Sequence, residues 1–142
     1  AHWPAGITSE LYGTFATQPG HVIDFLPTCL DLAGADYPEE FEGNEIIPVS
    51  GISLKPAFSG KALDRPEGVF FEHQGNAAVR MGDWKLVRSH KQPWELYNLG
   101  ADRTELNDLA ATHPERVEEL KAAWEVWAVR AGVLPWPINK KK

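Results

Sequence analysis

A helix-length segment near the C-terminus carries an apolar stripe that must be shielded from water. Its large apolar residues recur at spacings of 3, 4, 3 and 4, and they are Val117, Leu120, Trp124, Trp127 and Ala131. This spacing places them on one face of a helix. Burying each large side chain is worth about 1.5–3 kcal/mol. We therefore expect the helix to pack on another element and its stripe to form a core rather than a ligand groove.

Both ends of this segment carry signals that limit a helix. Thr112 and Glu115 have the spacing of a capping box, and Pro114 suits a first helical turn. Gly132 suits the position just after a helix. The sequence predicts a helix over 112–131 that begins with a capping box.

The residues before the helix predict an antiparallel meander. Segments 69–73, 77–81, 84–88 and 95–99 are rich in β-forming side chains, and a Gly-Asp pair suited to a tight turn separates the middle two. Sequential strands usually pair, so this small sheet is the simplest partner for the helix. Its inner face is expected to contain Val79 and Met81 on one arm, and Trp84, Leu86 or Val87 on the other.

Residues 1–66 have a different character, with seven of the eleven prolines and little periodic sequence. One short helix is predicted there, with Asp24 capping its start and Gly34 following its end. Asp31 is expected to face water, and the irregular stretch 36–48 is expected to be a surface loop. The buried face is predicted to comprise Phe25, Leu26, Cys29, Leu30 and Ala33.

Charge and composition exclude several classes of protein. A formal net charge of −6 argues against a nucleic-acid surface. No apolar run approaches the length of about 20 residues that a membrane helix needs, so no membrane partner is expected. Cys29, the single cysteine, excludes a disulfide framework and is predicted to be a buried, inert thiol. The triplet 140–142 is expected to be a solvated lysine tail.

Five stretches of the chain, taken in order, resemble one enzyme family. They are WPAGI at 3–7, HVIDFLPTCLDLAG at 21–34, GISL at 51–54, FEHQGNAAVRMGDWKLV at 71–87 and ELYNL at 95–99. Together they are similar to the C-terminal region of type I, arylsulfatase-like sulfatases, which belong to the alkaline-phosphatase superfamily. These enzymes are hydrolases that cleave sulfuric esters.

The resemblance implies an α/β fold, which is α+β within this fragment. Residues 1–66 would complete the large sulfatase α/β domain, and residues 67–142 would form its C-terminal subdomain, a small antiparallel sheet packed on the long helix. The rest of the sulfatase chain is then the expected partner. Without it, apolar side chains should be exposed and the fragment should self-associate. The side chains concerned are Phe15, Ile46, Ile47 and Phe58.

The resemblance also implies chemistry whose residues are not found in this chain. Sulfatases use a formylglycine made within a C/S-x-P-x-R motif, together with a divalent metal, usually calcium. Cys29 lacks the Pro and Arg of that motif, and the similarly spaced segment 112–116 begins with Thr. Asp24, Asp31 and Asp36 are interpreted as cap and surface charges. We therefore expect no catalytic residue, metal ligand or cofactor in this chain, and calcium and formylglycine in the full-length protein.

In the family, the strand that carries His73 approaches the mouth of the active-site cleft. The resemblance therefore implies that His73 contacts the aryl or glycan part of a sulfate-ester substrate, or the sulfate itself. Glu72 and Asn76 are further candidates, and Arg80 is a candidate for a positive group at the rim. The alternative is that His73 is a half-buried strand residue satisfied by a neighbour.

Two other functions remain open at this stage. One is a free-standing binding or structural module, which the negative net charge disfavours for sulfated glycans. The other is part of a related phosphatase or phosphodiesterase. The sulfatase resemblance is compatible with a periplasmic or secreted full-length protein.

Overall fold

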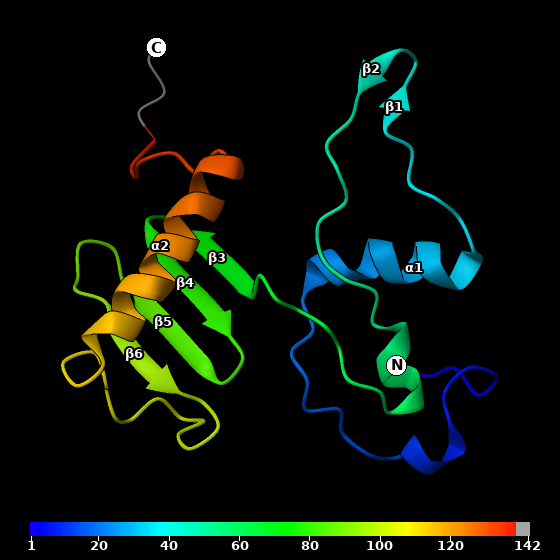
Figure 1. Cartoon of the computed structure of the whole chain (residues 1–142), viewed down its shortest axis with the longest axis horizontal. Coiled ribbons are helices and arrows are strands. Elements are labelled where there is room, and N and C mark those ends of the chain that lie inside the picture. The colour runs from blue at the N-terminus through cyan, green and yellow to red at the C-terminus, as the bar shows by residue number, and fades with distance from the viewer. Residues whose placement is uncertain (139–142) are drawn as a thin grey trace. The chain divides into compact units, whose positions relative to one another are not determined.

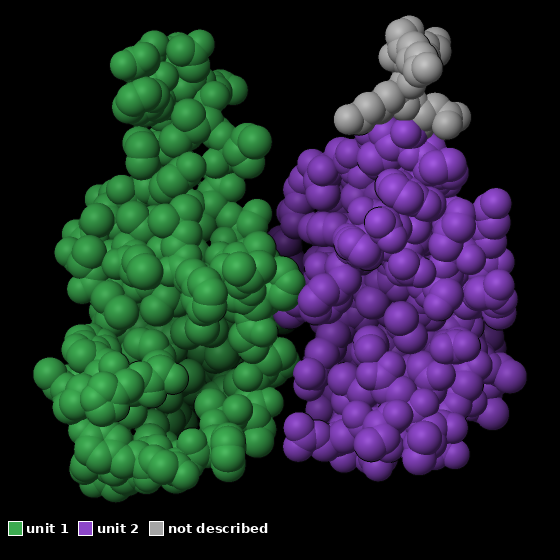
Figure 2. Space-filling view, turned by 180° about the vertical axis from the view of Figure 1, so that it is seen from behind, with its two compact units in different colours: residues 1–65 green, residues 66–142 purple. Residues whose placement is uncertain are grey.

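The computed structural model describes residues 1–138 and divides into two compact units, 1–65 and 66–142 (Figure 2). The lysine triplet 140–142 lies outside the described residues. Most contacts of each unit lie within that unit. Among the helices within residues 1–138, none is long and apolar enough to cross a membrane.

The second unit contains the predicted meander. Its sheet has the order β3-β4-β5-β6 with every neighbouring pair antiparallel, and its strands are β3 (Val69–His73), β4 (Asn76–Met81), β5 (Trp84–Arg88) and β6 (Glu95–Asn98). Val79 pairs with Leu86, and Leu86 pairs with Leu96, so three side chains with no measurable exposure line up across the sheet. The four strands predicted from the sequence are confirmed.

Helix α2 (Pro114–Arg130) lies across one face of this sheet (Figure 1). Leu120 and Trp124 are buried against it as the periodicity predicts. Ala128 is the third buried residue of the helix, whereas Ala131 lies beyond the helix and is exposed. The prediction that the stripe forms a core on the sheet is confirmed, with this change at its C-terminal end.

The predicted capping box at the start of α2 is wrong. His113 occupies the N-cap, and no side chain caps the helix. The Thr112 hydroxyl instead donates to the Leu109 carbonyl at 3.0 Å, which also accepts from the Thr112 and His113 N–H groups. Thr112 therefore belongs to a preceding turn, which takes its hydroxyl away from the helix. Pro114 does begin the helix, as expected.

The first unit is built from short elements around helix α1 (Phe25–Ala33). Three 3-10 segments accompany it, Ser9–Leu11, Val22–Asp24 and Lys55–Ser59. The stretch 36–48 is not wholly irregular, because β1 (Glu40–Phe41) and β2 (Asn44–Glu45) form a small hairpin. Its turn residues, Glu42 and Gly43, both have positive φ, as a tight hairpin turn requires.

Helix α1 does not bury the apolar face that was predicted, of which Leu30 is half-buried. Phe25 is 64% exposed and Leu26 is 48% exposed, and Cys29 is an exposed thiol, so the predicted apolar face and the buried cysteine are wrong. The buried residue of the helix is Thr28. Its hydroxyl donates to the Asp24 carbonyl at 2.6 Å and accepts from the Leu54 N–H at 2.8 Å. A polar contact to a distant loop therefore selects the buried face.

Asp24 is fully buried and occupies the N-cap position of α1, but its side chain makes no capping hydrogen bond to that helix. Its carboxylate accepts from the N–H groups of His21 (2.7 Å) and Ile52 (3.0 Å) and forms an ion pair with Arg65. Burial raises the pKa of Asp24, but the two N–H groups and the guanidinium outweigh it and hold the pKa below its ordinary value of 3.8. The interpretation of Asp24 as a surface charge is therefore wrong, and its side chain does not cap α1. Its carboxylate belongs instead to a capping box at the preceding 3-10 segment.

Candidate functional site

The tip of the hairpin formed by β3 and β4 brings most of the candidate site residues together. Gln74 and Gly75 form its two-residue turn, with φ of +54° and +83°. Positive φ at both positions is the signature of a type I′ turn, whose twist matches that of the flanking strands. His73 and Asn76 are therefore directly opposite each other at the turn.

Strand alternation divides the four candidates between the two faces of the sheet. Phe70 stacks on Trp127 of α2 with ring centroids 5.3 Å apart, so Phe70 and Glu72 belong to the face that α2 covers. His73 and Asn76 lie on the opposite face. Arg80, four residues after Asn76 in β4, shares that face. The sheet thus brings three of the four candidates together and separates Glu72 from them.

Glu72 and Asn76 are both engaged in holding the turn. The Glu72 carboxylate accepts from the Gly75 N–H at 2.8 Å. The Asn76 amide donates to the His73 carbonyl at 2.7 Å and accepts from the His90 N–H at 3.0 Å. Both side chains, which were predicted to contact substrate, therefore bind backbone groups and stabilise the turn.

His73 itself is exposed at the end of β3. Within the described part of the chain, its imidazole has no hydrogen bond to another protein group. The interpretation of His73 as a half-buried residue satisfied by a neighbour does not match this environment. An exposed imidazole can donate or accept a hydrogen bond to an external group.

Arg80 is the candidate with an uncompensated charge. Its Nε donates to the Gly82 carbonyl at 3.2 Å, and it forms no ion pair with any residue from 1 to 138. Lys85, directly opposite Arg80, is instead neutralised by Glu105 at 2.7 Å. Arg80 therefore gives this face of the sheet an available positive charge.

His90 belongs to the same site, although the sequence analysis did not select it. An added Cβ on Gly75 would lie 2.3 Å from Nδ1 and 2.9 Å from Cγ of His90, so the imidazole ring rests directly on the glycine. The residue lies in the loop between β5 and β6, 14 positions after Asn76. The register of β4 with β5 brings His90 against Gly75, and no local sequence pattern indicates that contact.

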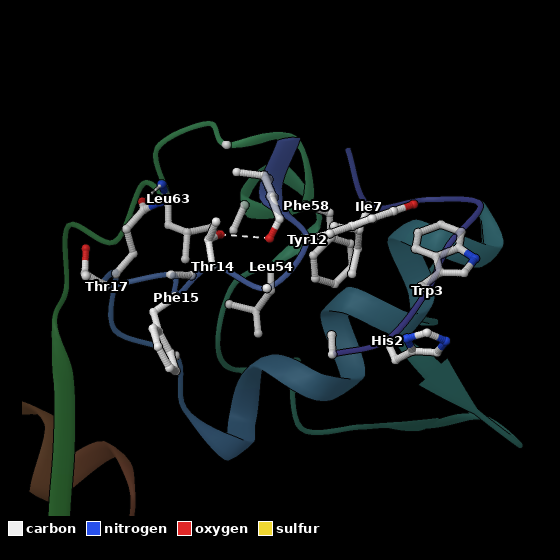
Figure 3. Close-up of a pocket in the computed structure, with 18 of the residues that line it drawn as sticks. His2, Trp3, Ile7, Tyr12, Thr14, Phe15, Thr17, Leu54, Phe58 and Leu63 are labelled. Atoms are coloured by element: carbon white, nitrogen blue, oxygen red, sulfur yellow. Dashed lines mark hydrogen bonds between the residues drawn. The ribbon is translucent and has the colours of Figure 1, made fainter. Parts of the chain in front are cut away.

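A second feature is a recess of about 740 Å³ in the first unit (Figure 3). Its wall is largely apolar and includes Trp3, Phe15, Phe58 and Leu63. No described residue in this wall has a carboxylate, ammonium or guanidinium side chain. The Tyr12 hydroxyl donates to the Pro4 carbonyl at 2.9 Å, so it is already engaged. The recess therefore offers mainly apolar surface to a ligand.

The aspartates of the first unit do not fit a calcium site. Asp24 is engaged by two N–H groups and Arg65, and Asp31 by Ser53 and Lys55. Calcium needs six to eight oxygen ligands gathered around one point. Over residues 1–138, no group of three or more His, Cys, Asp or Glu side chains is arranged to hold a metal ion.

Comparison with known proteins identifies the family. No family model matches the chain. A sulfatase of Schizosaccharomyces pombe, itself described as uncharacterized, is 33% identical over 123 residues, covering 82% of this chain and 22% of that protein. The chain belongs to the sulfatase family. The choline-sulfatase of Rhizobium meliloti is 35% identical over 65% of this sulfatase chain and 18% of its own length.

This sulfatase chain spans about a fifth of the length of the curated relatives that it matches. It corresponds to their C-terminal region, as the ordered motifs predict. The N-acetylglucosamine-6-O-sulfatase of Bacteroides thetaiotaomicron is a further relative, 32% identical over 69% of this chain and 19% of its own length.

Solved structures confirm the fold class. The crystal structure of Ps i-CgsB superposes with a TM-score of 0.69 and 27% identity, covering 89% of this chain and 27% of that one. The structure of BT4656 in complex with its substrate D-glucosamine-2-N,6-O-disulfate superposes with a TM-score of 0.53 and 26% identity. It covers 74% of this chain and 23% of that one. The end of an α/β sulfatase fold, followed by a small antiparallel sheet on a C-terminal helix, is the architecture that the resemblance implied.

Proposed function

We propose that this chain is the C-terminal part of an enzyme that hydrolyses sulfate esters, and that it supplies scaffold and substrate-facing residues. The observation that carries the proposal is the 33% identity to a sulfatase over 82% of the chain. Relatives named for choline sulfate and for a sulfated sugar support a sulfate ester as the substrate class, and BT4656 has a sulfated sugar as its substrate.

Within this enzyme, His73 is proposed to contact the substrate, with Arg80 at the rim. His73 is exposed at the tip of a hairpin whose turn is held on both sides. Arg80, on the same face, carries the positive charge that attracts a sulfate group. Glu72 and Asn76 are proposed to act through the turn rather than through the substrate.

The full-length sulfatase is proposed to use calcium and formylglycine. Asp24 and Asp31 do not fit such a metal site, because other donors already occupy their oxygens. No step of the reaction is therefore assigned to them. The remainder of the sulfatase chain is proposed to cover the exposed apolar side of α1, where Phe25 and Leu26 face solvent.

For the isolated 142-residue chain we expect no turnover of 4-nitrophenyl sulfate, whereas the full-length sulfatase releases 4-nitrophenol. We also expect sedimentation velocity to find the isolated chain self-associated through its exposed apolar side chains. Metal-dependent turnover by the chain alone would contradict the first expectation. A monomer at all accessible concentrations would contradict the second.

Replacing His73 with alanine in the full-length sulfatase should raise KM for a sulfate ester about two- to tenfold, as the loss of one hydrogen bond predicts. His73→Gln should recover part of this loss, because its amide can still donate or accept. The thermal midpoint should not move, since the side chain is exposed. Kinetics identical to the unaltered enzyme would remove His73 from the substrate site.

A further inference from the structure

The turn next to His73 is held by the side chains of Glu72, Asn76 and His90. Gln74 has a φ of +54°, a conformation that residues other than glycine adopt only occasionally. The Gly75 N–H is bound by the Glu72 carboxylate at 2.8 Å. A strained turn of this kind persists when its surroundings enforce it.

Asn76 connects this turn to a different part of the chain. Its amide nitrogen donates to the carbonyl of His73, and its amide oxygen accepts from the backbone N–H of His90, at 2.7 and 3.0 Å. Both ends of the amide are used, so its orientation is determined. Any displacement of the His73 backbone must therefore break a bond to Asn76 or move the loop that contains His90.

The His90 ring closes the turn from the other side. It packs so tightly on Gly75 that even a methyl group there would overlap the ring. Nδ1 is the ring atom nearest to the glycine, and the contact depends on the absence of a side chain at Gly75. His90 thus restricts the turn by packing, while its backbone N–H restricts Asn76.

We propose that Asn76 and His90 are positioning residues that hold the imidazole of His73 in place for the substrate. The proposal rests on the proposed function of His73. It assigns neither Asn76 nor His90 a contact with substrate. Both act on the backbone at 73–75, on which the His73 side chain depends.

A double-mutant cycle in the full-length sulfatase tests this coupling. We expect Asn76→Ala to raise KM by a factor similar to that of His73→Ala, and the double variant to be no worse than His73→Ala alone. Asn44→Ala is the matched control, because Asn44 makes the same kind of amide-to-carbonyl bond, to Glu42 at 3.2 Å, at the other hairpin turn. It should leave KM unchanged.

The ring of His90 is tested by a matched pair of variants. His90→Phe keeps an aromatic ring against Gly75 and keeps the backbone N–H that binds Asn76, so KM should remain within twofold of the unaltered enzyme. His90→Ala removes the ring and should raise KM as Asn76→Ala does. Equal losses in the two variants would mean that His90 acts through its nitrogens, which would overturn a positioning role.

Amide hydrogen exchange distinguishes the remaining outcomes. In Asn76→Ala and His90→Ala, exchange at residues 73–75 should become faster, with little change elsewhere. If His73→Ala itself leaves KM unchanged, the proposed function of His73 fails. If His73→Ala raises KM but Asn76→Ala is additive with it or exchange at 73–75 is unaltered, the positioning role alone fails.

Discussion

Replacing Asp24 with alanine is expected to lower the free energy of unfolding of the first unit by about 3–5 kcal/mol, the cost of removing one partner of a buried ion pair. The change leaves the Arg65 guanidinium, whose side chain is only 11% exposed, without its carboxylate. It also removes the acceptor for the N–H groups of His21 and Ile52. Most small domains have a total stability of only about 5–15 kcal/mol, so this loss removes a large part of the stability of the unit.

Amide hydrogen exchange of the whole chain measures this effect unit by unit. Protection in α1 should fall markedly in Asp24→Ala, while protection in β3 to β6 should persist. Asp31→Ala is the matched control. Asp31 lies in α1 and forms a solvent-exposed ion pair with Lys55, which lies outside that helix. Such a pair contributes about 0–1 kcal/mol. Equal losses in the two variants would contradict a special role for the buried carboxylate.

The pH dependence of the first unit follows from the same carboxylate. The folded-state pKa of Asp24 lies below its unfolded value of 3.8, so the folded state binds the proton less tightly than the unfolded state does. The contribution to stability is then fully present above pH 3.8 and is lost as the pH falls toward the folded-state pKa. Asp24→Asn should be less stable at neutral pH and should lose this acid-dependent component.

The second unit could be predicted from the sequence because its determinants are local. The Gly82-Asp83 pair fixes the register of β4 with β5, and alternation then brings Val79 opposite Leu86. The helix stripe has a periodicity that requires an apolar partner, and the adjacent sheet supplies it. Here the local signals and the tertiary packing agree, so the strands and the core were accessible from residue patterns alone.

The first unit could not be predicted in the same way, because long-range polar contacts choose the buried face of α1. The apolar spacing of Phe25, Leu26 and Cys29 is a valid helix pattern, yet those side chains face solvent in this chain. Asp24 and Thr28 are buried instead because they bind groups 26 to 41 positions away, at Ile52, Leu54 and Arg65. No sequence window contains those partners.

In the candidate site, too, the local features could be predicted from the sequence and the long-range contacts could not. Alternation along β3 and β4 places His73, Asn76 and Arg80 on one face, but the two-residue turn at 74–75 that sets their register was not predicted. His90 was not predicted, because two strands, β4 and β5, separate it from Gly75 in the sequence and no residue spacing indicates the contact. The assignment of substrate contacts rests on family resemblance, and the kinetic variants are its test.

Replacing Trp124 with alanine should destabilise the second unit by about 3–5 kcal/mol through the cavity that it leaves in the core. The indole is 8% exposed and meets the ring of Trp94 edge-on, with centroids 5.9 Å apart. The Arg88 guanidinium lies 5.6 Å from it. Urea unfolding of the whole chain, followed by circular dichroism at 222 nm, measures the loss. Val126→Ala on the same helix is the control, because that side chain is 72% exposed and should change stability by less than about 0.5 kcal/mol.

Trp124→Phe separates packing from hydrogen bonding at the same position. The Trp124 indole N–H donates to the Phe71 carbonyl at 3.0 Å, so this variant should lose about 1 kcal/mol for that bond and less for packing than alanine does. Phe71 lies in β3, two residues before His73, so the bond ties the strand that carries the candidate site directly to α2. In the full-length sulfatase, Trp124→Phe should therefore speed amide exchange along β3 and raise KM modestly. A variant that loses stability without either change would show that the core and the site are energetically independent.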